Sequence, residues 1–147
     1  MMLQTLPRPL VVLGLAGLLP QAFCLVMAMD SANHYFAIAA ACCYAAVILS
    51  FLGGMWWMAG ALGGLREPGV YILAVMPSLA AWAALLPWCV GWTWPGPSLA
   101  LLGVLLLMSP LADAALSSRM ALPAGWLRLR MVMAGGLGVL TLAIAAV

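Results

Sequence analysis

The sequence lacks lysine and has few charged side chains of any kind. Its 147 residues hold five arginines and three acidic residues, so that 5% are charged while 68% are hydrophobic. A soluble domain is about a quarter charged and about half apolar, so these charges are too few to cover a soluble surface. A bilayer removes that need, because lipid solvates apolar side chains directly. The same shortage argues against a nucleic-acid partner, since phosphate binding needs a basic face.

Clustered metal ligands and paired carboxylates are also missing. The cysteines, Cys24, Cys42, Cys43 and Cys89, form no CxxC pair, and His34 is the single histidine. A disulfide framework is typical of short secreted chains, whereas these cysteines lie in apolar runs, so we expect small buried hydrophobes. With nothing suited to acid–base or metal chemistry, we expect no enzyme activity, no catalytic residue, no metal and no cofactor.

Long apolar stretches are present instead. A spanning helix needs about 20 mostly apolar residues, and five stretches qualify: residues 10–29, 35–62, 70–87, 98–115 and 129–147. The first follows Arg8 as a signal peptide would, but it is long enough to span and shows no convincing cleavage site. We therefore predict a single all-α domain over residues 1–147, a polytopic bundle of five transmembrane helices.

The arginines predict the orientation. Arg8 precedes the first span, Arg66 lies between the second and third, and Arg119, Arg128 and Arg130 lie between the fourth and fifth. In a five-span chain all of these connections face one side. The positive-inside rule makes that side cytoplasmic, which predicts an N-in, C-out protein.

The connection at residues 87–97 holds three prolines, two glycines, three tryptophans and no charge. A continuous helix is therefore excluded, and we expect this segment in the headgroup region, where its backbone finds partners. Aromatic residues favour both interfaces. We assign Tyr35, Phe36, Trp88, Trp92 and Trp94 to the outer boundary, and Trp126, Tyr71 and Trp57 to the inner one.

Small residues are spaced along the second stretch. Ser50 and Gly54 form a small-xxx-small pair beside Gly53, and Gly60 and Gly64 continue the ridge. Such spacing lets helix backbones approach closely in lipid. It favours packing within this bundle, and the alternative is a seam for dimerisation or for docking another subunit.

Prolines lie inside or near the ends of three predicted helices, at Pro20, Pro77 and Pro110. Each removes a helical hydrogen bond and kinks its helix. Transporters use broken helices around midplane polar groups, and we find no such groups in that zone. Kinks that shape the bundle are the favoured interpretation.

Asp113 is the one acid within an apolar pattern, near the cytoplasmic end of the fourth span. Intramembrane ionisable residues are functional candidates by default. Arg119, Arg128 and Arg130 share its side of the membrane, so a structural ion pair from Asp113 to Arg128 or Arg130 would satisfy both charges. The alternative is a proton relay.

His34 is a weaker candidate, as a ligand to haem or a chlorin. It lies in a polar turn with Asn33 and Tyr35 at the outer edge of the membrane. A lone interfacial histidine is more often simply solvated, and this is the interpretation that we favour.

With these motifs in place, the chain resembles the domain of unknown function 3429 family, also called transmembrane protein 69-like. The resemblance covers nearly the whole chain, and its second-helix block is fairly specific. The matching residues are Gly17–Pro20, Tyr44, Ile48–Gly54, Trp57, Met76–Leu86, Asp113, Leu122–Ala124 and Trp126–Arg130.

Two positions depart from the family pattern. The family often has a basic residue where this chain has Trp56, and it has adjacent aromatics where this chain has Gly125 and Trp126. The resemblance implies a small inner-membrane protein, bacterial in this case, and it implies no enzyme activity.

Together, these features predict a non-catalytic accessory or assembly subunit of a larger, energy-transducing complex in the bacterial inner membrane. Its expected partners are the lipid bilayer and other membrane subunits. The alternatives are a small transporter or channel, and a subunit that binds a cofactor or pigment through His34.

Overall fold

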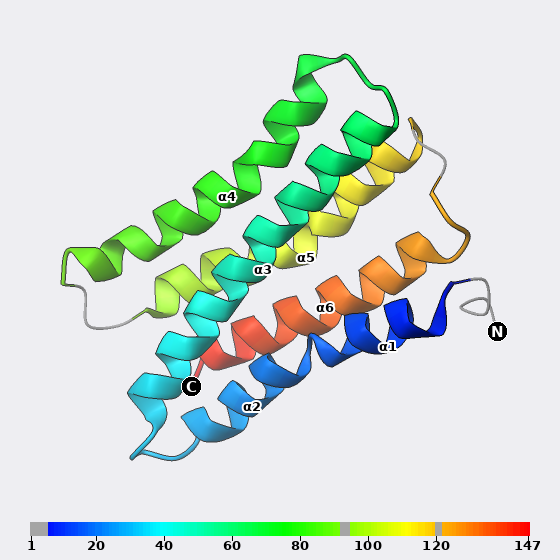
Figure 1. The fold of residues 1–147 in the computed structure, drawn as a ribbon. Helices are drawn as coiled ribbons and strands as arrows, with labels where there is room; N and C mark the ends of the chain where they lie inside the picture. The colour runs from blue at the N-terminus through cyan, green and yellow to red at the C-terminus, as the bar shows by residue number, and fades with distance from the viewer. Residues whose placement is uncertain (1–5, 92–94, 120–121) are drawn as a thin grey trace.

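The structure is a bundle of α-helices that run along its length (Figure 1). It is a computed structural model that describes residues 6–91, 95–119 and 122–147. The helices are α1 (Arg8–Ala16), α2 (Leu19–Ala28), α3 (His34–Leu62), α4 (Pro68–Cys89), α5 (Gly96–Ser117) and α6 (Trp126–Ala145). The described ranges contain no strand. The structure therefore confirms the all-α prediction.

Within the described residues, five helical segments are long and apolar enough to cross a membrane, with α1 and α2 together forming the first, Arg8–Ala28. Each end lies within three residues of the stretch expected from the sequence. Large apolar side chains such as Phe51, Leu79 and Leu111 remain more than half exposed on the outer surface. Lipid solvates such a surface and water does not, so the chain is a multi-pass membrane protein.

The first span differs from expectation because it is split into two helices. Pro20 has no N–H to offer to the carbonyl four residues before it, and the helix is interrupted at Gly17 and Leu18. The Tyr44 hydroxyl of α3 donates to the Gly17 carbonyl over 2.6 Å. A side chain of a neighbouring helix thus satisfies a carbonyl at the point where the helix is interrupted.

The other prolines lie within continuous helices. Pro77 and Pro87 lie in α4, and Pro110 lies in α5. Because Pro110 lacks an N–H, the Leu106 carbonyl loses its usual partner. The Ser109 hydroxyl donates to that carbonyl over 2.8 Å, which lets α5 continue through the proline.

The connection between α4 and α5 is shorter than its sequence suggests. The fourth helix passes Pro87 and ends at Cys89, and the chain then turns at Gly91, whose φ of 89° is left-handed. The next helix begins at Gly96. Trp92 and Trp94, assigned to the outer boundary, lie outside the described residues.

The longest helix, α3, is also the most buried: half of its span is inside the structure, against 11% for the first span. It contacts α2, α4, α5 and α6. The seam with α4 has a hydrogen bond between the Ser50 and Ser78 hydroxyls at 2.9 Å. A Cβ on Gly53 would lie 2.3 Å from the Ala74 carbonyl oxygen, and one on Gly60 would lie 3.0 Å from Val70.

The structure places Gly54 and Gly64 away from that seam. Gly54 is exposed, and nothing lies within 4 Å of where its Cβ would be. Gly64 follows α3 with φ +65°, and the Gly64 and Leu65 amides donate to the Ala61 and Gly60 carbonyls. This is a Schellman helix end, for which glycine is favoured because its φ is positive.

Two glycines bring α5 and α6 together. A Cβ on Gly103 would lie 3.3 Å from the Gly138 carbonyl oxygen, and one on Gly138 would lie 3.0 Å from the Gly103 carbonyl oxygen. Each glycine therefore receives the backbone of the other helix, the close approach expected of small residues in lipid.

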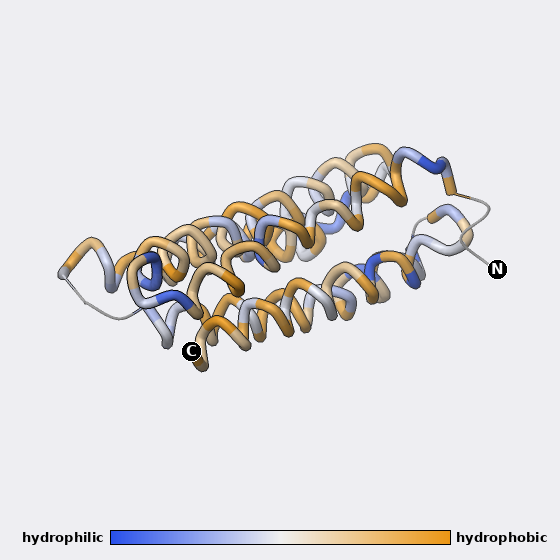
Figure 2. Tube along the Cα trace, turned by 90° about the horizontal axis from the view of Figure 1, so that it is seen from below, coloured by the Kyte–Doolittle hydropathy of each residue, from blue (hydrophilic) through white to orange (hydrophobic). Residues whose placement is uncertain are grey.

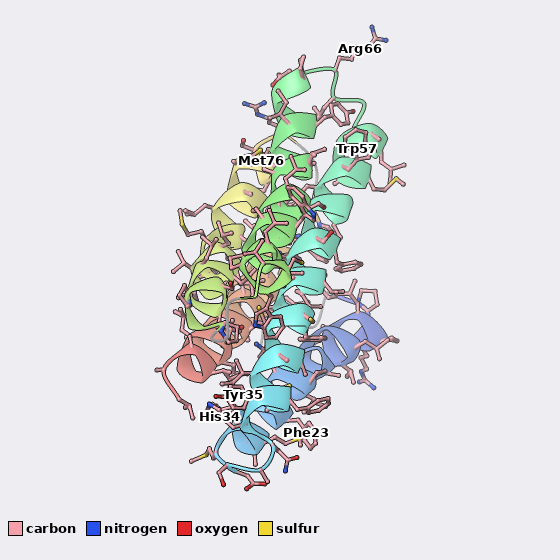
Figure 3. All side chains as sticks on the ribbon, turned by 90° about the vertical axis from the view of Figure 1, so that its left-hand side faces the viewer. Phe23, His34, Tyr35, Trp57, Arg66 and Met76 are labelled. Atoms are coloured by element: carbon pink, nitrogen blue, oxygen red, sulfur yellow. The ribbon has the colours of Figure 1, made fainter. Side chains whose placement is uncertain are left out.

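Hydrophobic residues predominate along the helices, and hydrophilic residues occur toward both ends of the bundle (Figure 2). Arg66 lies at one end, and His34 and Tyr35 lie at the other (Figure 3). At the Arg66 end, exposed Arg119 pairs with exposed Glu67, and the Trp57 and Tyr71 rings meet edge to face at 5.1 Å.

The cysteines differ in part from the expectation of burial. Cys24 and Cys42 are buried, whereas Cys43 and Cys89 are exposed, and all four are free thiols. In a membrane, a thiol on the outer face meets lipid, so exposure does not require a polar role.

Candidate functional site

Asp113 lies in α5, four residues before that helix ends at Ser117. At 1.5 Å per residue, this places it about 6 Å inside the helix end. The residue is only 3% exposed. An ionisable group so deeply buried in a membrane protein needs specific partners.

Two side chains from other helices provide those partners. Trp56 of α3 donates from Nε1 to the Asp113 Oδ1 over 2.9 Å. Arg130 of α6 donates from Nε to Oδ2 over 2.8 Å. We call Trp56, Asp113 and Arg130 the Asp113 cluster. It joins α3, α5 and α6 through both carboxylate oxygens.

Electrostatics explain why the members of the cluster occur together. Asp113 and Arg130 are each 3% exposed, and Trp56 beside them is 5% exposed. Both charges therefore lie where water cannot solvate them. Each ion offsets the burial cost of the other, and removing one partner leaves an uncompensated charge that costs about 3–5 kcal/mol. The Arg130 Nη2 is buried with no hydrogen-bond partner among the described residues.

The other arginines on this side are placed differently. Arg128 is exposed at the start of α6, and the structure pairs Asp113 with Arg130 rather than with Arg128. Arg119 pairs with Glu67. Side chains two residues apart on a helix point in different directions. Arg128 therefore lies on the exposed face of α6, and Arg130 lies on its buried face.

Trp56 was not predicted as a member of this site. The sequence presents it beside Trp57 in an apolar run, where both look like interface aromatics. A buried tryptophan usually finds an acceptor for its indole N–H, and this is the only signal in the sequence.

A second polar contact lies deeper in the bundle. Gln21 of α2 donates from Nε2 to the Thr141 Oγ1 of α6 over 2.9 Å, and both residues are 0% exposed. The Gln21 Oε1 is buried without a partner among the described residues. The sequence analysis did not single out this pair, because each is a lone polar residue within an apolar run.

His34 begins α3 and is partly buried. Its Nδ1 lies 2.8 Å from the Ala28 carbonyl at the end of α2, so that nitrogen donates and ties the two helices together. In the same turn, Asn33 donates to Asp30 over 2.7 Å. No group of three metal-ligating side chains occurs in the part of the chain that the structure describes.

The chain matches the family model described as a protein of unknown function (DUF3429), over residues 6–147. No curated protein and no solved structure matches it. The match covers all six helices, including the three that form the Asp113 cluster. The chain therefore belongs to the DUF3429 family.

Proposed function

We propose that this protein is a non-catalytic accessory or assembly subunit of a larger, energy-transducing complex in the bacterial inner membrane. The observation that carries the proposal is the Asp113 cluster. The one acid within a span has both oxygens occupied by donors from two other helices.

Proton relays and ion pathways depend on groups that the proton or ion can reach. Asp113 is 3% exposed and its charge is balanced by Arg130. Such a group holds helices together, because separating the helices would leave the charge in hydrocarbon without any hydrogen-bond partner. This arrangement supports a structural use of the intramembrane charge.

The outer face of α3 offers a surface for another subunit. Gly54 is exposed with open space beside it, and Val47 and Met58 are exposed along the same helix. An exposed small residue among large ones lets a second helix approach closely in lipid. We propose that a transmembrane helix of a partner subunit packs here.

The proposed orientation is N-in and C-out. Arg8, Arg66, Arg119, Arg128 and Arg130 all lie at or near the helix ends on one side of the bundle. The positive-inside rule supports a cytoplasmic location for this side.

Native electrophoresis after extraction in a mild detergent tests the proposal. We expect the protein to migrate with a larger complex, and Gly54→Leu to release it. Gly135→Leu is the matched control, because a Cβ on Gly135 of α6 also meets open space. A monodisperse free monomer extracted from native membranes would contradict the proposal.

A further inference from the structure

A cavity of about 280 Å³ opens between α1, α3 and α6. Its walls include Leu10 and Gly14 of α1, Phe51 and Met55 of α3, and Met133 of α6. An engineered apolar cavity of about 150 Å³ holds a benzene molecule. This one therefore has room for a segment of a hydrocarbon chain.

The cavity lies beside α1, the half of the first span that has no buried residue. Only 11% of that span is buried, and α1 meets α6 at Gly14, where a Cβ would lie 3.0 Å from the Met133 sulfur. Leu10 and Phe51 on its walls are 38% and 61% exposed. The cavity is thus open to the lipid that surrounds the bundle.

One wall of this apolar cavity carries a cation. Arg130 lines it, and although the Arg130 Nε bonds to Asp113, its Nη2 is buried with no partner among the described residues. Buried donors are nearly always paired. An oxygen atom of a molecule in the cavity could accept a hydrogen bond from this Nη2.

Arg8 and Arg128 are exposed at the end of the bundle nearest Arg130, at similar positions along the bundle axis. Gly14 lies six residues after Arg8, and Met133 lies five after Arg128. With a rise of 1.5 Å per residue, Arg8 and Arg128 therefore lie about 8–9 Å beyond the Gly14–Met133 contact. Neither α1 nor α6 has an acidic residue in its first turn, so the charge here is positive.

We infer that this cavity binds an anionic phospholipid. One acyl chain occupies the apolar cavity, the headgroup phosphate lies between Arg8 and Arg128, and an ester or phosphate oxygen accepts from Arg130. Charge complementarity selects an anionic lipid over a zwitterionic one. The inference does not depend on the partner subunit proposed above.

Thermal unfolding in detergent tests the site, with phosphatidylglycerol and phosphatidylcholine of the same acyl chains as probes. We expect phosphatidylglycerol to raise the Tm at lower concentration than phosphatidylcholine. Arg8→Gln and Arg128→Gln should each weaken the phosphatidylglycerol effect about fivefold, the contribution of one basic residue at an anionic surface. Arg66→Gln is the control, since Arg66 is likewise exposed but lies in the connection between α3 and α4, and not in the first turn of α1 or α6.

A second variant tests the cavity itself. Gly14→Leu fills the space, so it should abolish the preference for phosphatidylglycerol, while Gly135→Leu should retain it. The exposed arginine variants keep the test decisive if Gly14→Leu does not fold. Equal effects of the two lipids, an equal effect of inorganic phosphate or of an isoprenoid quinone, or full binding by the Arg8→Gln/Arg128→Gln double variant would each overturn the inference.

Discussion

At the scale of single residues, the Asp113 cluster brings two hydrogen bonds to one buried carboxylate together in one place. The carboxylate accepts from Trp56 and from Arg130, and all three side chains are at most 5% exposed. Hydrogen bonds to a charged group contribute more than neutral ones, about 1.5–3 kcal/mol each. Substitutions at these positions should therefore affect stability far more than substitutions of the exposed charges.

Replacing Asp113 by Asn should lower the accumulation of the protein in membranes. The amide oxygen can still accept from Trp56, but Arg130 then remains charged and buried without a counter-ion, which costs about 3–5 kcal/mol. Membrane accumulation and thermal unfolding in detergent measure the effect. Glu67→Gln is the control, because the exposed Glu67–Arg119 pair should contribute at most about 1 kcal/mol. Normal accumulation of the Asp113→Asn variant would show that the pair is not a structural contact.

Replacing Trp56 by Phe should destabilise the protein by about 1.5–3 kcal/mol, because it removes the N–H that donates to Asp113 and leaves a carboxylate oxygen unpaired. The neighbouring Trp57→Phe provides the comparison. Trp57 is 48% exposed, so the same change should cost less than about 1 kcal/mol. Equal losses at the two positions, measured by thermal unfolding, would contradict the role given to the Trp56 N–H.

At the scale of helices, close backbone contacts replace the hydrophobic driving force that a bilayer does not provide. Gly53 lies against the Ala74 carbonyl of α4, and Gly103 and Gly138 face one another between α5 and α6. Exposed Gly54, one residue from Gly53, has open space beside it. Two neighbouring glycines of α3 therefore lie on different faces of the helix, one packed against α4 and the other exposed.

This difference predicts opposite effects of one substitution at adjacent positions. Gly53→Ala should destabilise the protein by about 1–3 kcal/mol, because its Cβ would lie 2.3 Å from a backbone oxygen and the helices must separate. Gly54→Ala should be neutral or stabilising by up to about 1 kcal/mol, the helix propensity of alanine over glycine. Thermal unfolding of the two variants checks this, and a Gly53→Ala protein as stable as Gly54→Ala would refute the α3–α4 seam.

The spans could be predicted from the sequence because their signal is local. A run of about 20 apolar residues, bounded by Arg66-Glu67-Pro68-Gly69 or by Asp30 and Asn33, describes a helix and its ends without knowledge of its neighbours. The split in the first span is harder. Pro20 marks a lost hydrogen bond, but whether the helix bends or breaks depends on the Tyr44 hydroxyl that binds the Gly17 carbonyl.

The candidate site could be predicted only in part. Asp113 stands out because an acid in an apolar run is unusual, and the arginines of α6 are the nearest cations by topology. The choice of Arg130 over Arg128 depends on which face of α6 turns inward, and the apolar residues around both positions leave that face undefined. Trp56 and Gln21 join their partners across 57 and 120 residues of chain, and no local pattern reveals such pairs.

At the scale of the whole molecule, the distribution of charge is asymmetric along the bundle. The arginines gather at one end, and the Asp113 cluster lies just inside that end, about 6 Å along α5 and α6 from their termini. The other end carries Asp30, Asn33 and His34 with no arginine or lysine in the chain segment that connects α2 to α3. This asymmetry is the basis of the proposed orientation.

The orientation predicts the behaviour of reporter fusions in a bacterial host. A phosphatase joined after Val147 should be active, because that enzyme requires the periplasm, and one joined in the α3–α4 connection after Arg66 should be inactive. A fluorescent protein that folds only in the cytoplasm should give the reverse pattern. Phosphatase activity at both sites, or the opposite assignment, would contradict the N-in, C-out topology.

The central claim is that the buried charges of the Asp113 cluster serve to hold α3, α5 and α6 together. A double-mutant cycle on Asp113→Leu and Arg130→Met, followed by thermal unfolding of the purified proteins, tests it most directly. Each single variant should lose about 3–5 kcal/mol, whereas the double variant should be close to the unmodified protein, because no buried charge is then left alone. Losses that simply add in the double variant, or single variants as stable as the unmodified protein, would contradict the claim.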